Sequence, residues 1–507
     1  MDNIVQIGDK PVTLKDFINV VMKKYNVELT QSAIDRINKS RDVVDKIVNE
    51  KQVKYGISTG FGSLCRKTIT GDELDTLQSN LIRSHAVGVG KICKKHIARG
   101  MLFLRLVCIA NGNSGVRLCL ANTFVEAINK GFCPLIPKVG SVGASGDLCP
   151  LSHLVLGLMG EGLAYDEETN EYINALEVLK KLKMEPITLK AKEGLAMNNG
   201  TQFITTWTAL ALYEALRCYD AANLIAAVSV EALHGVHNAF DPRIHQVKPH
   251  NGQIHVANKL WKHLRPNGEP SEIFNTYCKD KVQDAYSLRC IPQIHGTVYD
   301  LLHFVKKIVE TEMNSSNDNP LVFDNDIISG GNFHGMYIGM AADQIAYAMT
   351  ILCNNSERRL ERMVNHSLNG FMPSCLAPNA GLNSGLMIVQ YAAAAVTAEN
   401  RQLANPGSVH SIPTCEGSED IVSMAAWPAR KAYKSTNNTY DALAFELFTA
   451  FQALGFTKEK PSNVVQKLYT HIKETLKVPQ INNDCYMKPY IDSVNEYIHS
   501  EEFDYLV

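Results

Sequence analysis

The chain has 507 residues, of which 45% are hydrophobic and 20% are charged, a composition typical of globular proteins. Its 50 basic residues nearly balance its 52 acidic ones, so no excess of positive charge predicts a nucleic-acid partner. Its 13 cysteines include no CxxC pair, which argues against a zinc site and a disulfide framework and favours reduced thiols in a cytoplasmic protein.

The beginning of the chain has no basic segment followed by an apolar run, so no secretory signal is predicted. The most apolar stretch, 201–234, is interrupted by Glu214, Arg217, Asp220 and Glu231. Its uncharged runs are too short to span a bilayer. We therefore expect a buried core helix there and no membrane partner.

Helical periodicity dominates the chain and predicts a mainly α fold with sparse strands. The predicted helices cover 94–110, 116–130, 151–159, 202–233, 296–312, 335–365, 384–403 and 440–454. Several of them are apolar on most faces, which is typical of a helix bundle with neighbours on all sides. We expect one unit over 1–507, with a loop-rich N-terminal part (1–200) and a long-helix bundle part (201–507).

Segments rich in Gly, Asn, Ser and Thr separate the helices. They cover 55–63, 140–150, 198–202, 314–320, 329–335 and 416–424. Polar loops on a rigid helical scaffold commonly carry an active site, although any one of them alone is equally compatible with an ordinary turn.

The segment 140–153, GSVGASGDLCPLSH, can build an electrophile from its own backbone. Its three glycines allow a tight bend, in which the amide nitrogen of Gly146 can attack the carbonyl carbon of Ala144. Loss of water closes a five-membered imidazolone, and loss of the Ser145 hydroxyl as a second water leaves an exocyclic methylene. The chemistry needs small neighbours, an unhindered glycine nitrogen and a serine.

A helix is predicted directly after this segment. Pro150 suits a first helical turn, and Leu151, Leu154, Val155 and Leu158 continue an apolar stripe. The positive end of the helix dipole would therefore lie beside the imidazolone and stabilise negative charge on it.

The extended string around Ala144-Ser145-Gly146 closely resembles the signature of the histidine and phenylalanine ammonia-lyase family, and the resemblance runs over nearly the whole chain. It implies the long-helix bundle of the ammonia-lyase and fumarase type. It also implies 4-methylideneimidazole-5-one (MIO), formed autocatalytically from the tripeptide, with no metal and no external cofactor. A small amino acid is the implied substrate, and a homotetramer with active sites shared between subunits is the implied assembly.

The resemblance also implies roles for single residues. Tyr55, in YGISTGFG, matches the tyrosine proposed as base for the β-proton, and Asn199 matches an asparagine that lies against the cofactor. Phe333 matches an aromatic residue near cofactor and substrate. Met387 matches an active-site methionine, with a core packing role also open. Asn198 departs from the family, which has an apolar residue there.

The segment QDAYSLRC at 283–290 resembles the family's substrate clamp. The guanidinium of Arg289 matches an α-carboxylate with two parallel donors. Gln283 and Tyr286 add polar contacts, and the spacing predicts that all three lie on one helical face.

Two positions bear on the substrate. Ser84-His85 resembles the pair of histidine-selective members, although some tyrosine-selective members also have this histidine. Glu419 stands where histidine-selective members have glutamate and aromatic-selective ones have glutamine. A carboxylate can accept the imidazole N–H, whereas beside a phenyl ring it would be an unpaired buried charge. Asp284 also favours histidine, whereas Ile421 resembles the aromatic type.

We therefore expect non-oxidative elimination of ammonia from L-histidine to trans-urocanate, the first step of histidine degradation. Whether the amine or the aromatic ring adds to the cofactor stays open. The alternatives are a tyrosine or phenylalanine ammonia-lyase or aminomutase of the same family, a fumarase-like lyase acting on a dicarboxylate, and a non-catalytic helical scaffold.

Overall fold

The computed structural model describes residues 3–60, 69, 73–324 and 326–506. Most of these residues are helical, and the strands within them form four two-stranded sheets. The predicted mainly α fold is thereby confirmed. The chain divides into two compact units of three segments each: unit 1 is Met1–Tyr213, Lys306–Asp343 and Pro406–Arg430, and unit 2 is Glu214–Val305, Gln344–Asn405 and Lys431–Val507.

Unit 1 holds the strands and the shorter helices of the N-terminal half. Its helices are α1 (Leu14–Val21), α2 (Gln31–Asn49), α3 (Glu73–His85), α4 (Lys95–Ala110), α5 (Leu118–Lys130), α6 (Leu148–Leu158), α7 (Ala175–Lys181) and α8 (Glu193–Asn198), with a 3-10 turn η5 (Cys415–Gly417). Its strand pairs are β1 (Ile4–Ile7) with β2 (Asn26–Leu29), β3 (Val89–Ile92) with β4 (Pro137–Val139), β5 (Leu163–Asp166) with β6 (Glu171–Asn174), and β7 (Leu321–Phe323) with β8 (Asp326–Ile328). The first pair is parallel and the others are antiparallel.

The named elements in the described part of unit 2 are all helical. Unit 2 contains α10 (Pro242–Gln246), α11 (Asn251–Leu264), α12 (Tyr286–Arg289), α15 (His366–Asn369), α16 (Met387–Leu403), α18 (Asn463–Glu474), α19 (Lys488–Ile498) and α20 (Glu501–Asp504), with short turns η2 (His237–Phe240), η3 (Phe274–Cys278) and η4 (Ser374–Leu376). Four long helices have residues in both units: α9 (Gln202–Ala232), α13 (Ile291–Met313), α14 (Met336–Val364) and α17 (Ala426–Leu454).

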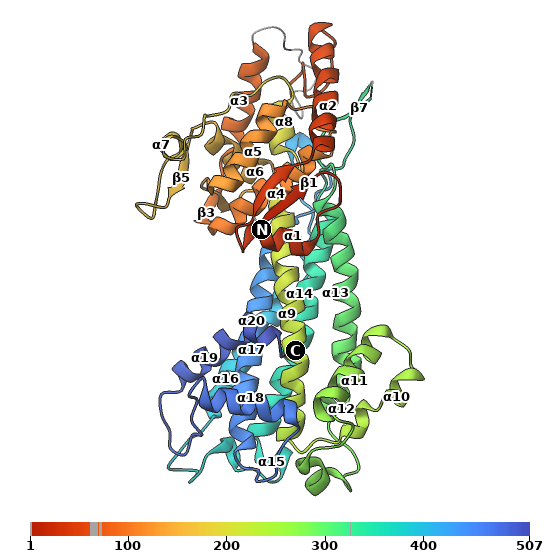
Figure 1. Ribbon diagram of the computed structural model, residues 1–507, viewed down its shortest axis with the longest axis vertical. Helices are drawn as coiled ribbons and strands as arrows, with labels where there is room; N and C mark the ends of the chain where they lie inside the picture. Colours follow the sequence, from red (N-terminus) through yellow and green to blue (C-terminus); the bar gives the residue numbers. More distant parts are fainter. Residues whose placement is uncertain (1–2, 61–68, 70–72, 325, 507) are drawn as a thin grey trace. The chain divides into compact units, whose positions relative to one another are not determined.

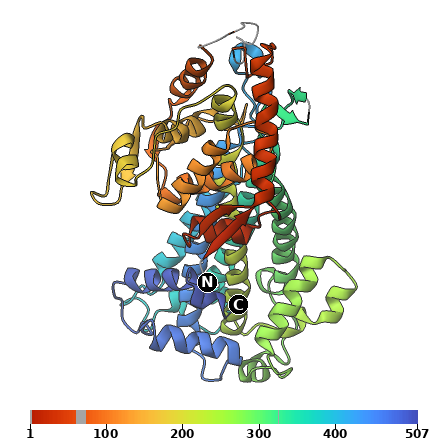
Figure 2. The ribbon, with the colours of Figure 1, turned by 45° about the horizontal axis from the view of Figure 1, so that its top comes forward.

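Within unit 2 the long helices run side by side (Figures 1 and 2) and are joined by buried polar bonds. Glu446 of α17 accepts from Ser229 of α9 and from Arg359 of α14. His295 of α13 is hydrogen-bonded to Asn223 of α9. Many of the residues buried around these bonds are apolar, as the all-round hydrophobic pattern predicts.

Seven of the eight predicted helices begin within a few residues of an observed start, whereas α17 begins at Ala426 and not at Tyr440. Its first turns contain Ser435, Thr436 and Thr439, all fully buried. The Thr436 and Thr439 hydroxyls donate to carbonyls one turn earlier, so polar residues occupy a buried helical stretch that the apolar pattern did not include in the predicted helix.

One helix in the described part, α14, is long and apolar enough to span a membrane. Its most apolar window is 67% buried within the protein, as expected of a core helix. Its polar residues include the fully buried Arg359, a side chain that is costly in lipid unless it is paired.

Three helices of unit 1 form the frame of the candidate site. α3, α6 and α8 pack against one another (Figure 1). The segment 140–147 enters α6, and Asn199 ends α8. This packing brings the tripeptide next to residues some fifty positions later in the chain.

Candidate active site

The backbone around the tripeptide folds back on itself, as the glycine spacing predicts. Gly143 has φ +66° and Gly146 φ +70°, in the left-handed region that favours glycine. The Ser141 hydroxyl accepts from the Gly143 N–H at 3.0 Å and donates to Asp147 Oδ1 at 2.8 Å. From the other side, Ser423 Oγ donates to the Gly143 carbonyl at 2.8 Å. The bend is therefore held at both ends by side-chain hydroxyls.

The residues after α8 form a wall against this bend. Asn199 Nδ2 donates to the Ser145 carbonyl oxygen at 2.9 Å, and the Asp147 N–H donates to the Gly200 carbonyl at 2.6 Å. A Cβ on Gly146 would lie only 2.1 Å from the Gly200 oxygen. Glycine at 146 is thus required by the close approach of two backbone segments, besides the unhindered nitrogen that the cyclisation chemistry needs.

Helix α6 begins at Leu148, three residues before the predicted start, with Pro150 in its first turn. Its N-cap residue, Asp147, is fully buried, and this burial raises the pKa of the Asp147 carboxyl to about 7, although hydrogen bonds from the Ile204 N–H and the Ser141 hydroxyl oppose the rise. The positive end of the helix dipole therefore lies directly after the tripeptide.

A pocket of about 340 Å³ opens onto Ser145. Five of the predicted site residues line it: Tyr55, His85, Ser145, Asn199 and Glu419. The remaining lining residues, which the sequence did not single out apart from Ser84, are Gly60, Leu77, Asn80, Leu81, Ser84, Leu148, Leu195 and Cys415. The pocket is lined entirely by residues of unit 1. The sequence motif around Tyr55 continues into 61–63, which lies outside the described residues.

The Glu419 carboxylate is held at both oxygens. Ser145 Oγ donates to Oε1 at 2.6 Å, and Thr414 Oγ1 donates to Oε2 at 2.5 Å. Thr414 and Glu419 also face each other across an antiparallel bridge, closed by the Thr414 N–H and the Glu419 carbonyl at 3.0 Å. Thr414 is a site residue that the sequence analysis missed, because only this folded-back loop brings it to Glu419.

The His85 imidazole lies at the end of α3, half-buried, with Nδ1 2.9 Å from Ser84 Oγ. Burial lowers the pKa of His85, and the charge of Glu419 offsets part of that effect. We therefore expect a neutral imidazole at pH 7, able to donate with one ring nitrogen and accept with the other.

Ala144 and Gly146 flank Ser145 without lining the pocket, and five further predicted site residues do not line it either. Phe333 belongs to unit 1 and is half-buried. The other four belong to unit 2: Gln283, Tyr286, Arg289 and Met387.

The predicted helical face of the clamp segment is wrong for Gln283. α12 covers only Tyr286–Arg289, with Ala285 as N-cap. Residues 281–285, which precede this helix, are not helical. Buried Asp284 holds them in another conformation, because it accepts from the Val236 N–H at 2.5 Å and pairs with Lys281 at 2.6 Å. Tyr286 and Arg289 do share a face, with the guanidinium carbon 4.8 Å from the ring centroid.

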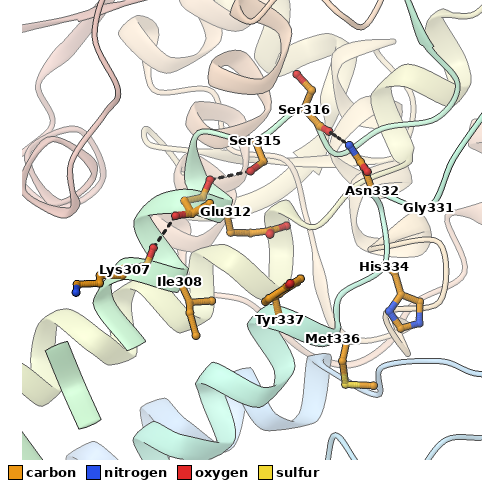
Figure 3. A pocket seen from close by; sticks show the side chains of 11 residues that line it. Lys307, Ile308, Glu312, Ser315, Ser316, Gly331, Asn332, His334, Met336 and Tyr337 are labelled. Carbon is orange, nitrogen blue, oxygen red and sulfur yellow. Dashed lines mark hydrogen bonds between the residues drawn. The ribbon is translucent and has the colours of Figure 1, made fainter. Parts of the chain in front are cut away.

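A larger cavity, of about 630 Å³, lies elsewhere in unit 1 (Figure 3). It is lined by Lys307, Ile308, Thr311, Glu312, Ser315, Ser316, Gly331, Asn332, His334, Met336 and Tyr337. None of the predicted site residues lines it, although its residues 331, 332 and 334 flank Phe333. Size alone does not define an active site; the smaller pocket contains the serine, carboxylate and imidazole that the chemistry needs.

Neither metal ligation nor disulfide bonding is seen in the described part of the chain. No group of three His, Cys, Asp or Glu side chains there could hold a metal ion. All the cysteines described are free thiols, and most are buried.

The chain is similar to proteins of known class over most of its length. The aromatic amino acid lyase family matches residues 12–474. The histidine ammonia-lyase of Alkaliphilus oremlandii is 44% identical over 89% of this chain and 88% of its own. The crystal structure of histidine ammonia-lyase from Trypanosoma cruzi superimposes with a TM-score of 0.91 at 38% identity, over 99% of this chain and 94% of that one. The tyrosine aminomutase from Streptomyces globisporus gives 0.92 at 31% identity, over 99% and 98%. On these grounds the chain belongs to the aromatic amino acid lyase family.

Proposed function

We propose that this protein is a cytoplasmic ammonia-lyase that eliminates ammonia from L-histidine to give trans-urocanate. The observation that carries the proposal is the hydrogen bond between the Ser145 hydroxyl and the Glu419 carboxylate. Glu419 Oε1 lies 2.6 Å from Ser145 Oγ, in a pocket that His85 also lines. Two relatives named histidine ammonia-lyase, at 44% and 38% identity, support the same substrate.

We infer that Ala144, Ser145 and Gly146 form MIO, which when present supplies an electrophilic methylene at the Ser145 position. The residues fit this group. Gly146 already has the left-handed backbone of a tight bend, and the closure releases two waters, one from the Ala144 carbonyl oxygen and one from the Ser145 hydroxyl. Asn199 Nδ2 donates to the Ser145 carbonyl, which becomes the ring carbonyl, where a donor stabilises negative charge.

Glu419 gives a physical reason to favour histidine. In the unprocessed chain its Oε1 accepts from the Ser145 hydroxyl, and its Oε2 from Thr414. Loss of that hydroxyl leaves Oε1 without its donor, still aimed at the pocket. An imidazole N–H can replace the lost donor, whereas a phenyl ring would leave a partly buried charge unpaired.

Tyr55 is the group we assign to remove the β-proton, since it is the only phenol among the described residues that line the pocket. A free phenol titrates near 10. It therefore needs positive charge or hydrogen-bond donors around it to act as a base at neutral pH.

The substrate clamp requires more than one copy of the chain in this proposal. Gln283, Tyr286 and Arg289, with Met387 and Phe333, are absent from the residues that line the pocket. Tyr286 is 69% exposed and its neighbour Val282 is 94% exposed, as expected of an apolar surface that a second subunit covers. We propose a homotetramer in which these side chains complete the site of another copy.

The first test is the mass and turnover of the purified protein. The intact mass should fall short of the translated sequence by two waters, and Ser145→Ala should lose that deficit and at least about 10³-fold in turnover. Histidine should give urocanate faster than tyrosine gives coumarate. An active protein of full mass would overturn the MIO proposal, and faster coumarate formation would overturn the choice of substrate.

The second test separates substrate choice from reaction type. Glu419→Gln keeps an acceptor oxygen and removes the charge, so kcat/KM for histidine should fall about 10²-fold. The two-water deficit should stay. Thr414→Val, which frees Oε2 but keeps the carboxylate, should cost less. An unchanged kcat/KM for histidine in Glu419→Gln would show that the Glu419 carboxylate does not recognise the imidazole of the substrate.

A further inference from the structure

Beside the pocket lies a buried cation whose oxygen partners are all neutral, and which also contacts Cys108 Sγ at 3.9 Å. Arg105 of α4 is fully buried. Its Nη1 donates to the Ala196 carbonyl at 3.0 Å, and its Nη2 donates to the Asn199 carbonyl at 2.9 Å and to Gln202 Oε1. The guanidinium therefore ties the end of α8 to the start of α9, the junction that contains Asn199 and Gly200.

A continuous chain of hydrogen bonds leads away from this cation. Gln202 Nε2 donates to Asn317 Oδ1 at 2.7 Å, and Asn317 Nδ2 donates to Thr201 Oγ1 at 2.7 Å. The Thr201 hydroxyl then donates to Glu312 Oε1. Asn317 Nδ2 also makes a longer, direct contact of 3.4 Å to the same oxygen. All four side chains belong to unit 1, and all but Glu312 are buried to within 3% exposure.

The direction of this chain is fixed by its two ends. A guanidinium can only donate and a carboxylate can only accept. Gln202 must therefore turn its oxygen to Arg105 and its nitrogen to Asn317, and Asn317 must turn its nitrogen to Thr201. Such a chain polarises every bond in the same sense, which strengthens each of them.

This series of hydrogen bonds, the Arg105 hydrogen-bond chain, surrounds Gly200. A Cβ at this glycine would lie 2.4 Å from Arg105 Nη2, 2.7 Å from Asn317 Oδ1 and 2.7 Å from Gln202 Oε1. The Gly200 carbonyl in turn accepts from the Asp147 N–H, and the neighbouring Asn199 amide donates to the Ser145 carbonyl. The backbone that the Arg105 hydrogen-bond chain encloses, at Asn199 and Gly200, is thus the wall against which the tripeptide bends.

We propose that Arg105, Gln202, Asn317, Thr201 and Glu312 are positioning residues for the electrophile. They hold Asn199 and Gly200 in the one arrangement that places a donor on the Ser145 carbonyl and an acceptor on the Asp147 N–H. This inference rests on the proposed function, because it assigns a purpose to the Asn199 contact. Glu312 ends the chain at the wall of the larger cavity (Figure 3), where burial raises the pKa of its carboxyl.

Thr201 is the place to interrupt the chain, because it both accepts from Asn317 and donates to Glu312. Thr201→Val has nearly the same shape and removes both bonds, and Thr201→Ser keeps the hydroxyl and serves as the matched control. In Thr201→Val we expect kcat for histidine to fall about tenfold or more, while KM stays within about twofold. A misplaced group stabilises the transition state less, and this loss is larger than any loss of substrate binding. Thr201→Ser should keep kcat within about twofold.

The intact mass and the melting temperature are measured on the same samples. A slower or incomplete loss of two waters in Thr201→Val, relative to Thr201→Ser, also supports positioning. Equal kcat and equal mass deficit in the two variants would overturn the inference. The wild-type mass and turnover report separately on the proposed function, so its failure is distinguishable from a failure at Thr201.

If Thr201→Val does not fold, a second variant, Glu312→Gln, tests the positioning role of the hydrogen-bond chain. Glu312→Gln keeps an oxygen acceptor and the side-chain shape on a half-buried residue, but it adds a donor and removes the charge that fixes the direction of the chain. A loss of kcat at unchanged KM supports the inference. A Glu312→Gln enzyme with wild-type kcat and mass deficit overturns it.

Discussion

Each unit of this protein buries an arginine completely, and the two arginines are held in different ways. In unit 2, Arg359 donates from Nε to Glu446 Oε1 at 2.5 Å and from Nη2 to Oε2 at 2.8 Å, a direct two-point ion pair. In unit 1, Arg105 donates to two backbone carbonyls and an amide oxygen, and its hydrogen-bond chain reaches a carboxylate only through neutral side chains, those of Gln202, Asn317 and Thr201.

This difference between the two arginines separates a contact that stabilises the fold from contacts that position the reactive groups. The Arg359–Glu446 pair joins α14 to α17 and balances its own charge by direct contact. The Arg105 chain fixes a stretch of backbone that touches the reactive tripeptide. We therefore expect changes in the unit 2 pair to alter the free energy of unfolding, and changes around Arg105 to alter turnover.

The largest effect is expected for Gly200→Ala, which inserts a methyl group into the centre of the Arg105 chain. Gly200 has φ +145°, which L residues rarely adopt, and its Cβ would lie 2.4 Å from the guanidinium. The backbone wall must shift, so turnover should fall at least about 10³-fold. Intact mass shows whether the two waters are still lost.

Gly131→Ala is the control for this prediction. Gly131 also has a left-handed backbone, φ +76° at the end of α5, but a Cβ there meets nothing within 4 Å. It should cost about 1 kcal/mol of stability and leave turnover intact. Similar turnover in the two variants would refute the special role of the Gly200 wall.

The second effect concerns stability and tests the unit 2 pair. Glu446→Gln leaves the Arg359 charge buried without a counter-charge, which should lower the free energy of unfolding by about 3 kcal/mol. The joint change Arg359→Met and Glu446→Leu removes both charges and should recover most of that loss. Urea unfolding measures the stability, and kcat per folded protein should stay constant. A loss of kcat without a loss of stability would contradict the division between the two regions.

The smallest effect is a pH dependence that comes from Asp147. Because its pKa in the folded protein, about 7, exceeds the ordinary value of 3.8, the folded state binds this proton more tightly than the unfolded state. The stabilisation is fully present below pH 3.8 and is lost as the pH rises to about 7. Between pH 5 and 7 the free energy of unfolding should fall by about 2 kcal/mol.

Asp147→Asn should abolish that fall. Both proteins are best compared with Ser145→Ala in place, so that cofactor formation cannot differ between them. Urea midpoints at pH 5 and pH 8 give the measurement. Parallel pH profiles with and without the Asp147 carboxyl would show that its burial does not control stability.

Most of the fold could be predicted because helical periodicity is a local property. The starts of α4 and α9 were predicted to within one residue from apolar spacing alone. The errors occurred where polar residues had buried roles, as in the first turns of α17. The same holds at Gln283, where Asp284 is drawn to Val236 and Lys281 and the helix is delayed to Tyr286.

The sequence by itself determined the reactive tripeptide, since its cyclisation depends on three consecutive residues and their covalent chemistry. It also determined the types of the groups that surround it. Only the tertiary structure decided that Tyr55, His85, Asn199 and Glu419 share one pocket with Ser145, and that Arg105 is connected to Glu312. The physical reason is that a buried polar group must find a partner wherever packing brings one. Arg105 and Gln202 are 97 residues apart in the chain, and no spacing rule reaches that far.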